Sequence, residues 1–316
     1  MTIGIAAAGR RAGRAAFEAL RAVEKVSRGA IGGFVSFVAI SSEGTLLRAE
    51  TQRGGTATLF TSGESTGIEP PLAFAEAPFA ALMSSGPDRP EPLAQFTPGN
   101  PEVGLVTGHR LPNMPGVDGV PLNQAVLQRL CGGCSPAQAI DAELSRNPQA
   151  DAGLIAVDIQ GRIQLANSAF VAKRPDLGSA LLEDREIGAT VGVLHNAIHP
   201  HGGLATLAAS VALDQIAPLD HCDFEVELAS GLLLELGEEN CIHLDSELRV
   251  ERLTVTEKCW FAPKWHGAAI SFAAAVRRDG LLVGSATSEP YCTAMDGRLL
   301  SFSGQDRVFI AVRAVR

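Results

Sequence analysis

The runs Gly153-Leu-Ile-Ala-Val-Asp-Ile159 and Arg162-Ile-Gln-Leu-Ala-Asn167, separated by Gln160-Gly161, decide the fold of this chain. The first run is too short for a typical helix and is rich in branched side chains, which predicts a buried strand. The second run alternates apolar and polar residues, which predicts a half-buried strand that returns beside the first. Ile163, Leu165 and Asn167 share one face of the return strand, so Asn167 is expected on its apolar side.

Two helices are predicted directly before this hairpin. Apolar residues recur at helical spacing from Leu122 to Leu130, and a pair of glycines ends that helix at Gly132. The second helix begins at Ser135, because Ser-Pro-Ala-Gln is a capping box with proline in the first turn. In this motif the serine oxygen accepts from the free N–H three residues on, and the glutamine reaches back. The helix ends at Asn147, which precedes a proline.

The order of helix, Gly153–Asp158 strand, glycine turn and return strand ending at Asn167-Ser168 resembles the core of N-terminal-nucleophile (Ntn) hydrolases. It is similar to the isoaspartyl-peptidase and γ-glutamyltransferase type, and to an uncharacterised bacterial group related to them. The resemblance implies an αββα sandwich of antiparallel sheets. In the peptidases a nucleophilic threonine opens this strand, whereas Asp151-Ala152-Gly153 stands in that place here.

The other predicted elements complete an α+β protein with two regions. Residues 1–221 contain the Ntn-hydrolase-like αββα core, and residues 222–316 form a β-rich C-terminal region in which apolar runs alternate with turns. The pattern of apolar residues predicts strands at Thr2–Ala8, Phe34–Ile40, Thr45–Gln52, Thr56–Phe60 and Ile187–Leu194, and helices at Gly9–Val26, Leu177–Glu186 and from Leu204 onward.

Residues 61–102 show the weakest local pattern. Prolines recur between Pro70 and Pro101, interspersed with serine, glycine and alanine. A long irregular loop within a compact protein is uncommon and is usually a lid, a binding loop or a linker. We therefore expect a Pro-rich loop over 61–102.

The composition narrows the class of protein. The 316 residues are 46% hydrophobic and 19% charged, which suits a globular chain with a substantial core. The net charge of −9 argues against nucleic acid as a partner, since phosphate binding needs clustered Lys and Arg. No apolar run is long enough to cross a membrane, so no membrane contact is expected.

Six irregularly spaced cysteines predict reduced thiols and a cytoplasmic protein. The positive charges near the start of the chain follow its first apolar run, the reverse of their order in a secretory signal. Cys131 and Cys134 form the closest pair, and they belong either to a helix-to-helix turn or to a redox or metal site. We expect no bound cofactor, and a homo-oligomer in solution.

Hydrogen-bonding side chains gather in two loops that follow strands. The segment from Thr107 to Asn113 is stiffened by glycine and proline, which suits either a small-molecule site or a well-capped surface loop. We expect this loop and the turn from His195 to Gly203 to lie close together at one pocket. The candidate substrate-binding residues are His109, Arg110, Asn113, Asn167, His195, Asn196, His199 and His201.

The three histidines at positions 195, 199 and 201 stand before a predicted helix and allow three interpretations. They could ligate a metal, but their spacing is irregular and no acidic residue accompanies them. The free N–H groups of the helix could bind an anion or a substrate beside them. The segment could also be a structural turn. We expect no dependence on zinc.

The sequence supports three hypotheses of function. An amidohydrolase of the Ntn type, acting on a small amide, would use a side-chain hydroxyl whose proton passes to the chain's own α-amino group, which titrates near neutrality. Thr2 is the candidate nucleophile, because removal of Met1 exposes a threonine at the head of a strand. The alternatives are a non-catalytic small-molecule-binding or assembly protein on the same fold, and a metal-dependent hydrolase at the histidine cluster.

Overall fold

The computed structural model describes residues 1–29, 31–216, 218 and 222–315. The chain divides into two compact units, Met1–Ala217 and Pro218–Arg316, each with its own hydrophobic core. The division lies close to the change of pattern expected at residue 222. The first unit combines helices with antiparallel sheets and the second is rich in strands, so the predicted α+β class with a β-rich C-terminal part is confirmed.

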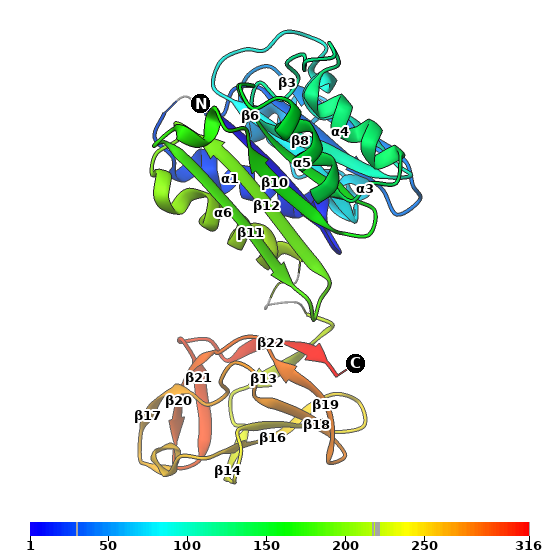
Figure 1. Ribbon diagram of the computed structural model, residues 1–316. Helices are drawn as coiled ribbons and strands as arrows, with labels where there is room; N and C mark the ends of the chain where they lie inside the picture. The colour runs from blue at the N-terminus through cyan, green and yellow to red at the C-terminus, as the bar shows by residue number, and fades with distance from the viewer. Residues whose placement is uncertain (30, 217, 219–221, 316) are drawn as a thin grey trace. The chain divides into compact units, whose positions relative to one another are not determined.

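The first unit is built around a six-stranded antiparallel sheet with the order β11-β12-β1-β6-β2-β3 (Figure 1). Its strands are β1 (Thr2–Ala8), β2 (Val35–Ile40), β3 (Leu46–Thr51), β6 (Phe79–Ser85), β11 (Leu177–Asp184) and β12 (Ala189–Asn196). The predicted strand at the start of the chain thus becomes β1, which pairs along its whole length with β12 on one side and with β6 on the other.

Helices α1 (Ala12–Val26) and α6 (His201–Ile216) cover one face of this sheet. Small residues let α1 approach closely, since most of its alanines and Gly13 are buried against neighbouring elements. Apolar residues at helical spacing in this helix are fully buried: Ala12, Ala16, Ala19, Leu20 and Val23. Burial of this stripe anchors the helix to the sheet.

A second antiparallel sheet has the order β10-β9-β8-β7 and consists of β7 (Gly99–Asn100), β8 (Gly104–Arg110), β9 (Ala152–Asp158) and β10 (Ile163–Asn167). The predicted hairpin is confirmed as β9 and β10, which pair from Val157–Ile163 to Gly153–Asn167. Helices α4 (Leu122–Cys131) and α5 (Pro136–Arg146) pack on this sheet. The capping box at Ser135 forms with both of its hydrogen bonds.

The two sheets of the first unit lie face to face. Along β1, Ile3, Ile5 and Ala7 pack toward α1 and α6, whereas Ala6 and Ala8 pack against residues of the second sheet. The sheets approach very closely, since a Cβ added at Gly4 would lie 2.5 Å from the carbonyl oxygen of Gly108. The layers therefore follow the order helices, sheet, sheet, helices.

Three expectations about local structure are wrong. The segment 61–102 is not one irregular loop, because it contains β6, which lies between β1 and β2 at the centre of the first sheet. Residues 177–186 are not a helix but the edge strand β11, in which exposure alternates. Residues 56–60 form a helical turn, not a strand. The remaining short elements of the first unit are α2 (Thr56–Leu59), β4 (Thr61–Ser62), β5 (Ser65–Thr66), α3 (Leu72–Ala75), η1 (Leu93–Phe96) and η2 (Val171–Lys173).

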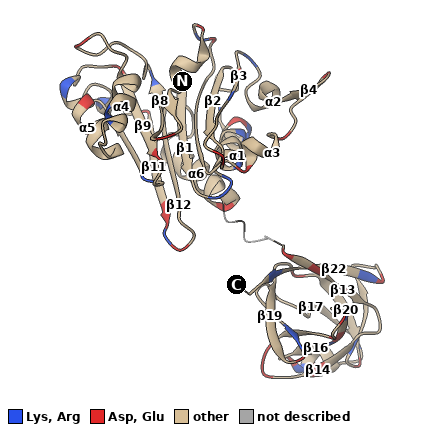
Figure 2. Ribbon diagram, turned by 90° about the vertical axis from the view of Figure 1, so that its right-hand side faces the viewer, with Lys and Arg blue, Asp and Glu red and all other residues tan. Residues whose placement is uncertain are grey.

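The second unit contains a ten-stranded sheet with the order β13-β22-β19-β18-β15-β16-β14-β21-β20-β17. Its elements are β13 (Phe224–Ala229), β14 (Leu233–Leu236), β15 (Cys241–Leu244), β16 (Val250–Val255), η3 (Lys258–Phe261), β17 (Trp265–Ala268), β18 (Ala275–Arg278), β19 (Leu281–Ala286), β20 (Tyr291–Met295), β21 (Arg298–Phe302) and β22 (Arg307–Ala314). Two pairings are parallel, β14 with β16 and β15 with β18. Figure 2 shows these strands curving around a common interior, with acidic and basic residues interspersed.

In the part of the chain that the structure describes, none of the helices combines the length and the apolar character that a membrane crossing requires.

Candidate functional site

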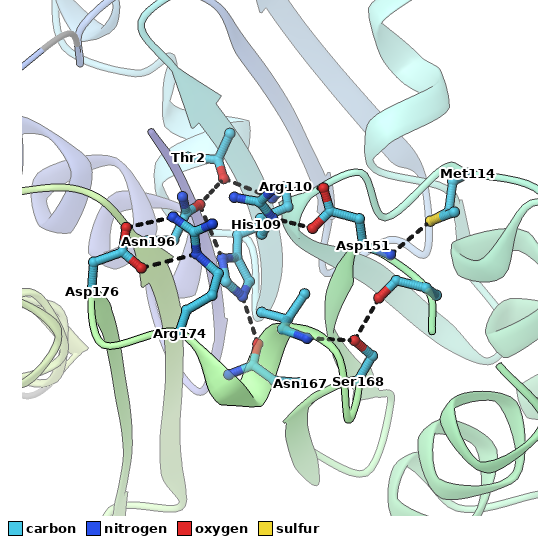
Figure 3. Close-up of polar contacts among 12 residues, drawn as sticks. Thr2, His109, Arg110, Met114, Asp151, Asn167, Ser168, Arg174, Asp176 and Asn196 are labelled. Atoms are coloured by element: carbon cyan, nitrogen blue, oxygen red, sulfur yellow. Dashed lines mark hydrogen bonds and ion pairs between the residues drawn. The ribbon is translucent and has the colours of Figure 1, made fainter. Parts of the chain in front are cut away.

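The polar cluster in Figure 3 lies where β1 begins. Thr2 is paired with Asn196 of β12 on one side and with Ser85 of β6 on the other. Paired residues of neighbouring antiparallel strands point their side chains to the same face, so these three residues form one row. The row faces the second sheet, because Thr2 alternates in step with Gly4 and Ala6, which pack against that sheet.

The hydroxyl of Thr2 is held by one residue from each sheet. Its Oγ1 donates to Asn196 Oδ1 at 2.6 Å and accepts from the backbone N–H of Arg110 at 2.6 Å. The residue is only 2% exposed. Thr2 is therefore a buried threonine whose hydroxyl has a defined direction and polar neighbours.

His109 connects the row to the second sheet through two asparagines. Its Nδ1 lies 3.3 Å from Asn196 Oδ1, and its Nε2 lies 2.6 Å from Asn167 Oδ1. Burial lowers the pKa of His109, and the hydrogen bonds to the two asparagines oppose this effect. The ring is thus neutral at pH 7 and carries a single N–H. That N–H can donate to only one of the two asparagine oxygens. The other ring nitrogen can accept from its asparagine only if the oxygen and nitrogen of that amide exchange places.

Gly153 provides the space for this arrangement. A Cβ at Gly153 would overlap the ring of His109 and the side-chain oxygen of Asn167. The expectation that Asn167 points to the buried side of β10 is consistent with its contact to His109, which replaces apolar packing at the end of the strand. The glycine that opens the fold-deciding run therefore serves the site as well as the strand.

Two bidentate ion pairs border the cluster. The guanidinium of Arg110 donates to both carboxylate oxygens of Asp151, at 2.6 Å for Nη2 and Oδ2. Arg174 donates to Asp176 in the same way, at 2.9 Å and 2.6 Å. The hydrogen bond to Arg174 lowers the pKa of the Asp176 carboxyl, so the pair is ionised at neutral pH.

Two residues with left-handed backbone conformation lie next to the Thr2 hydroxyl. Arg110 has a φ of 65°, and Ala197, which follows Asn196, has a φ of 56°. Residues other than glycine adopt this conformation at a cost of about 1–3 kcal/mol, and such strain collects at functional sites. One of these two residues, Arg110, supplies the N–H that the Thr2 hydroxyl accepts.

The structure brings together only part of the predicted substrate-binding set. Thr2, His109, Arg110, Asn167 and Asn196 form the cluster. The contact between His109, in β8, and Asn196, in β12, shows that the two segments approach each other, and the pocket expected there stays a prediction. Asn113 lies outside it, because its amide donates to Gln95 Oε1 at 2.8 Å.

His195, His199 and His201 do not join the Thr2 cluster. His195 lies on the opposite face of β12 from Asn196, since neighbouring residues of a strand point to opposite faces. His199 and His201 stack on each other with ring centres 4.4 Å apart, and Nδ1 of His201 lies 2.9 Å from the carbonyl oxygen of Ile198. Among the described residues, no group of three or more His, Cys, Asp or Glu side chains is placed to hold a metal ion. This geometry does not favour the metal-dependent alternative.

The buried ring of His195 should make the stability of the first unit depend on pH. It is fully buried, neither ring nitrogen has a hydrogen-bond partner among the residues that the structure describes, and burial lowers its pKa to about 4. The unfolded chain takes up a proton at a pKa of about 6.5, so the free energy of unfolding should fall by about 3 kcal/mol between pH 6.5 and pH 4 and then level off. Denaturant unfolding followed by helical circular dichroism measures this effect, because the long helices all belong to the first unit.

His195→Leu should remove this part of the pH dependence, since leucine takes up no proton. The exposed His266, in the second unit, provides the matched control: His266→Leu should leave the dependence unchanged. An equally steep fall of stability in His195→Leu would contradict the assignment.

Three residues of the site were not among the predicted ones. Ser85 belongs to β6, which was expected to be part of an irregular loop. Arg174 and Asp176 lie before β11, which was expected to be helical. Asp151 was noted as the replacement of the peptidase threonine, and the structure shows it as the partner of Arg110. The spacing of Arg174 and Asp176, two residues apart, was a visible signal for a local ion pair.

Two family models match the chain. A domain of unknown function (DUF6963) matches residues 2–224, which include every residue of the site, and a second domain of unknown function (DUF7259) matches residues 231–307. Neither curated proteins nor solved structures give a match. The first model covers more than half of the chain, and the protein therefore belongs to the DUF6963 family.

Proposed function

We propose that this protein is an amidohydrolase of the Ntn type that acts on a small amide, with Thr2 as its nucleophile. The observation that carries the proposal is the position of the Thr2 hydroxyl, which is held at 2.6 Å by Asn196 and at 2.6 Å by the N–H of Arg110 at the beginning of the central strand. The order of layers in the first unit supports the resemblance to Ntn hydrolases, since that family has a helix–sheet–sheet–helix sandwich.

The base in this proposal is the α-amino group of Thr2 after removal of Met1. In the chain with Met1, burial is the main cause that lowers the pKa of the terminal amine, and Arg89, Arg110 and Arg174 lower it further. The amine of Thr2 would lie one residue further into the same positive surroundings. A lowered pKa increases the neutral fraction of that amine at pH 7, and only the neutral amine accepts a proton.

The hydrogen bonds of Asn196 offer a way to release the hydroxyl proton. Neutral His109 can give its N–H to Asn167 and accept at Nδ1 from the NH₂ of Asn196. The same NH₂ group then donates its second hydrogen to Thr2 Oγ1. This orientation exchanges the oxygen and the nitrogen of the Asn196 amide relative to the structure, in which Thr2 Oγ1 donates to Asn196 Oδ1. After the exchange, Thr2 Oγ1 accepts from Asn196 and from Arg110, and its own hydrogen is free to pass to the amine.

The proposed reaction has two stages. Thr2 Oγ1 attacks the amide carbon while its proton moves to the α-amine, and the resulting ammonium gives this proton to the departing amine as the C–N bond breaks. Water then attacks the ester formed on Thr2, losing one proton to the α-amine. The carboxylic acid leaves and Oγ1 recovers its hydrogen. His109 positions Asn196 in this scheme and does not touch the substrate.

The second candidate is a non-catalytic small-molecule-binding or assembly protein on the same fold. The observation that favours it is Asp151, which takes the place of the peptidase threonine and is paired with Arg110. An assembly role would draw on the edge strand β11, where Leu181 is 46% exposed and backbone groups are open to pairing. We infer a homo-oligomer in either case, which light scattering measures. The six free cysteines support a cytoplasmic location.

Two measurements together test the proposed function. Intact mass and N-terminal sequencing of natively expressed protein decide whether Thr2 becomes the first residue. Release of amine from a set of small acyl amides then decides whether the processed protein hydrolyses them. If processed protein hydrolyses none of these amides, the amidohydrolase proposal is wrong and the binding-protein alternative replaces it.

A further inference from the structure

We propose that a groove on the outer face of the second unit binds a short peptide with free amino and carboxyl ends. The groove contains none of the residues of the Thr2 site, and all of its lining residues belong to the second unit. The features that point to a ligand are a floor of short side chains that crosses the strands, an ion pair that bridges this floor, and hollows of opposite charge on the two sides of the bridge.

The floor of the groove follows from the register of neighbouring strands. Thr254 in β16 is paired with Cys241 in β15. Cys241 is paired in turn with Ala275 in β18, and Ala275 with Ser285 in β19. These residues alternate along their strands with residues of the hydrophobic core, so they point away from that core. Short side chains thus form a continuous row across four strands on the outer face.

An ion pair crosses this floor. β15 and β18 run parallel, Arg277 lies two residues after Ala275, and Glu239 lies two residues before Cys241. The two charged side chains therefore start on opposite sides of the row, and they meet with Nη2 of the arginine 2.9 Å from Oε1 of the glutamate.

The bridge explains why the thiol of Cys241 is buried. This residue is only 1% exposed, although it points away from the hydrophobic core. Burial raises the pKa of the Cys241 thiol, Glu239 raises it further, and Arg277 opposes this effect. The charges that act on the thiol are thus those of the bridge, which places the ion pair of Arg277 and Glu239 over the floor.

The bridge separates two hollows of opposite character. The first is lined by Glu238, Glu239, Cys241, His243 and Thr254, and the lining of the second includes Glu239, Arg277, Ser285 and Arg313. Their volumes of about 470 and 350 Å³ are in the range of small-molecule sites. Burial lowers the pKa of His243, so its ring adds little positive charge at pH 7. Carboxylates therefore dominate the first hollow, and guanidinium groups dominate the second.

Opposite charges at the two ends favour a zwitterion. The carboxylates of the first hollow would repel an anion such as phosphate, and the guanidinium groups of the second would repel a simple cation. The ammonium of a zwitterion can pair with Glu239 while its carboxylate pairs with Arg277. Two ion pairs with the ligand then replace one within the protein, and the net charge of the groove does not change.

The spacing of the strands sets the length of the ligand. Cys241 lines the first hollow and Ser285 the second, and two strand intervals separate them. Neighbouring strands lie about 4.8 Å apart, so the ends of the ligand should be about 10 Å apart. An extended chain covers about 3.3 Å per residue, which makes a tripeptide the matching length.

Isothermal titration calorimetry on the full chain tests the proposal. The chain carries Thr2→Ala, so that the proposed nucleophile cannot hydrolyse the probe. The probes are trialanine, N-acetyl-trialanine amide, which lacks both charges, and alanine, which is too short to reach both hollows. We expect trialanine to bind at least about tenfold more tightly than the other two, because hydrogen bonds between charged groups are the stronger ones.

Arg277→Gln and Glu239→Gln should each abolish the preference for free ends, because each removes one of the charges that the ligand pairs with. The matched controls are Arg249→Gln and Glu247→Gln, which break an exposed ion pair of the same unit outside the groove. Both controls should keep the full preference. Circular dichroism checks that each variant is folded.

Alkylation of Cys241 measures the bridge independently of any ligand. Arg277→Gln and Glu239→Gln break the ion pair, so iodoacetamide should modify this thiol at least about tenfold faster in both variants. Peptide mass spectrometry follows the reaction, with the exposed Cys131 as the internal reference.

The proposal is overturned if trialanine does not bind at millimolar concentration, if the capped peptide or alanine binds equally well, or if folded Arg277→Gln keeps the preference for free ends. Unchanged alkylation of Cys241 in both variants would show that the ion pair does not cover the floor. Tighter binding of inorganic phosphate than of trialanine would overturn the assignment of a zwitterion.

Discussion

Thr2→Ala is expected to lower the rate of amide hydrolysis by at least about 10³-fold, because it removes the only proposed nucleophile while leaving the α-amine in place. Binding of substrate should change little, so the loss should appear in kcat and not in KM. Steady-state kinetics on the processed protein measures both constants. Thr2→Ser should keep a measurable rate, since it preserves a hydroxyl at the same position.

The stability of Thr2→Ala has to be measured alongside its activity. The Thr2 hydroxyl is buried and makes two hydrogen bonds, so its removal leaves Asn196 and the N–H of Arg110 short of a partner. Such a loss costs about 1–3 kcal/mol. The exposed Thr66, in β5, is the matched control, and Thr66→Ala should change neither stability nor rate. A folded Thr2→Ala protein with normal turnover would remove Thr2 from the mechanism.

The α-amine gives an independent version of this test. A chain with extra residues ahead of Thr2 retains the hydroxyl but has no free amine at that position, so it should be folded and inactive. Release of those residues by a specific protease should restore the rate. Hydrolysis by protein that retains Met1 would exclude the α-amine of Thr2 as the base.

Gly153→Ala is expected to disrupt the site strongly, although it adds only one methyl group. The new Cβ would overlap the His109 ring and Asn167, and the backbone of Gly153 is fixed by pairing with both β8 and β10. Overpacking of this kind costs about 1–3 kcal/mol. The displaced ring would also release Asn196, so the rate should fall even where the protein is folded. Denaturant unfolding and kinetics measure the two effects.

Gly203→Ala is the matched control for this substitution. Gly203 lies in α6, and a Cβ there would meet no atom within 4 Å. Alanine is favoured over glycine within a helix by about 0.5–1 kcal/mol, so this variant should be slightly more stable and fully active. If Gly153→Ala had the stability and the rate of the original protein, neither property would depend on the observed position of the His109 ring.

Local signals in the sequence predicted the parts of the fold that depend on neighbouring residues. The hairpin of β9 and β10, the capping box at Ser135 and the buried stripe of α1 all formed as expected. Each of these follows from periodicity or from hydrogen bonds within a few residues. Thr2, His109, Asn167 and Asn196, which were candidate site residues, do contact one another in a hydrogen-bonded chain.

The errors occurred where a distant partner decides the structure. The apolar part of β6 is short and lies among prolines, and it becomes a central strand because β1 and β2 pair with it on both sides. Residues 177–184 are strand because β12 provides backbone partners, although their own pattern also allowed a helix. Interactions between segments far apart in sequence override weak local preferences of this kind.

By itself the sequence determined the class of fold, the strand that begins at Thr2 and most of the polar residues at its end, since these depend on the order and spacing of residue types. Only the tertiary structure decided which residues form the site. It placed His195 on the helix side of β12 and Asn196 on the side of Thr2, because neighbouring residues of a strand face opposite ways. It also brought Ser85 beside Thr2. The pairing of β1 with β6 joins residues 83 positions apart, and no local pattern in the chain encodes that contact.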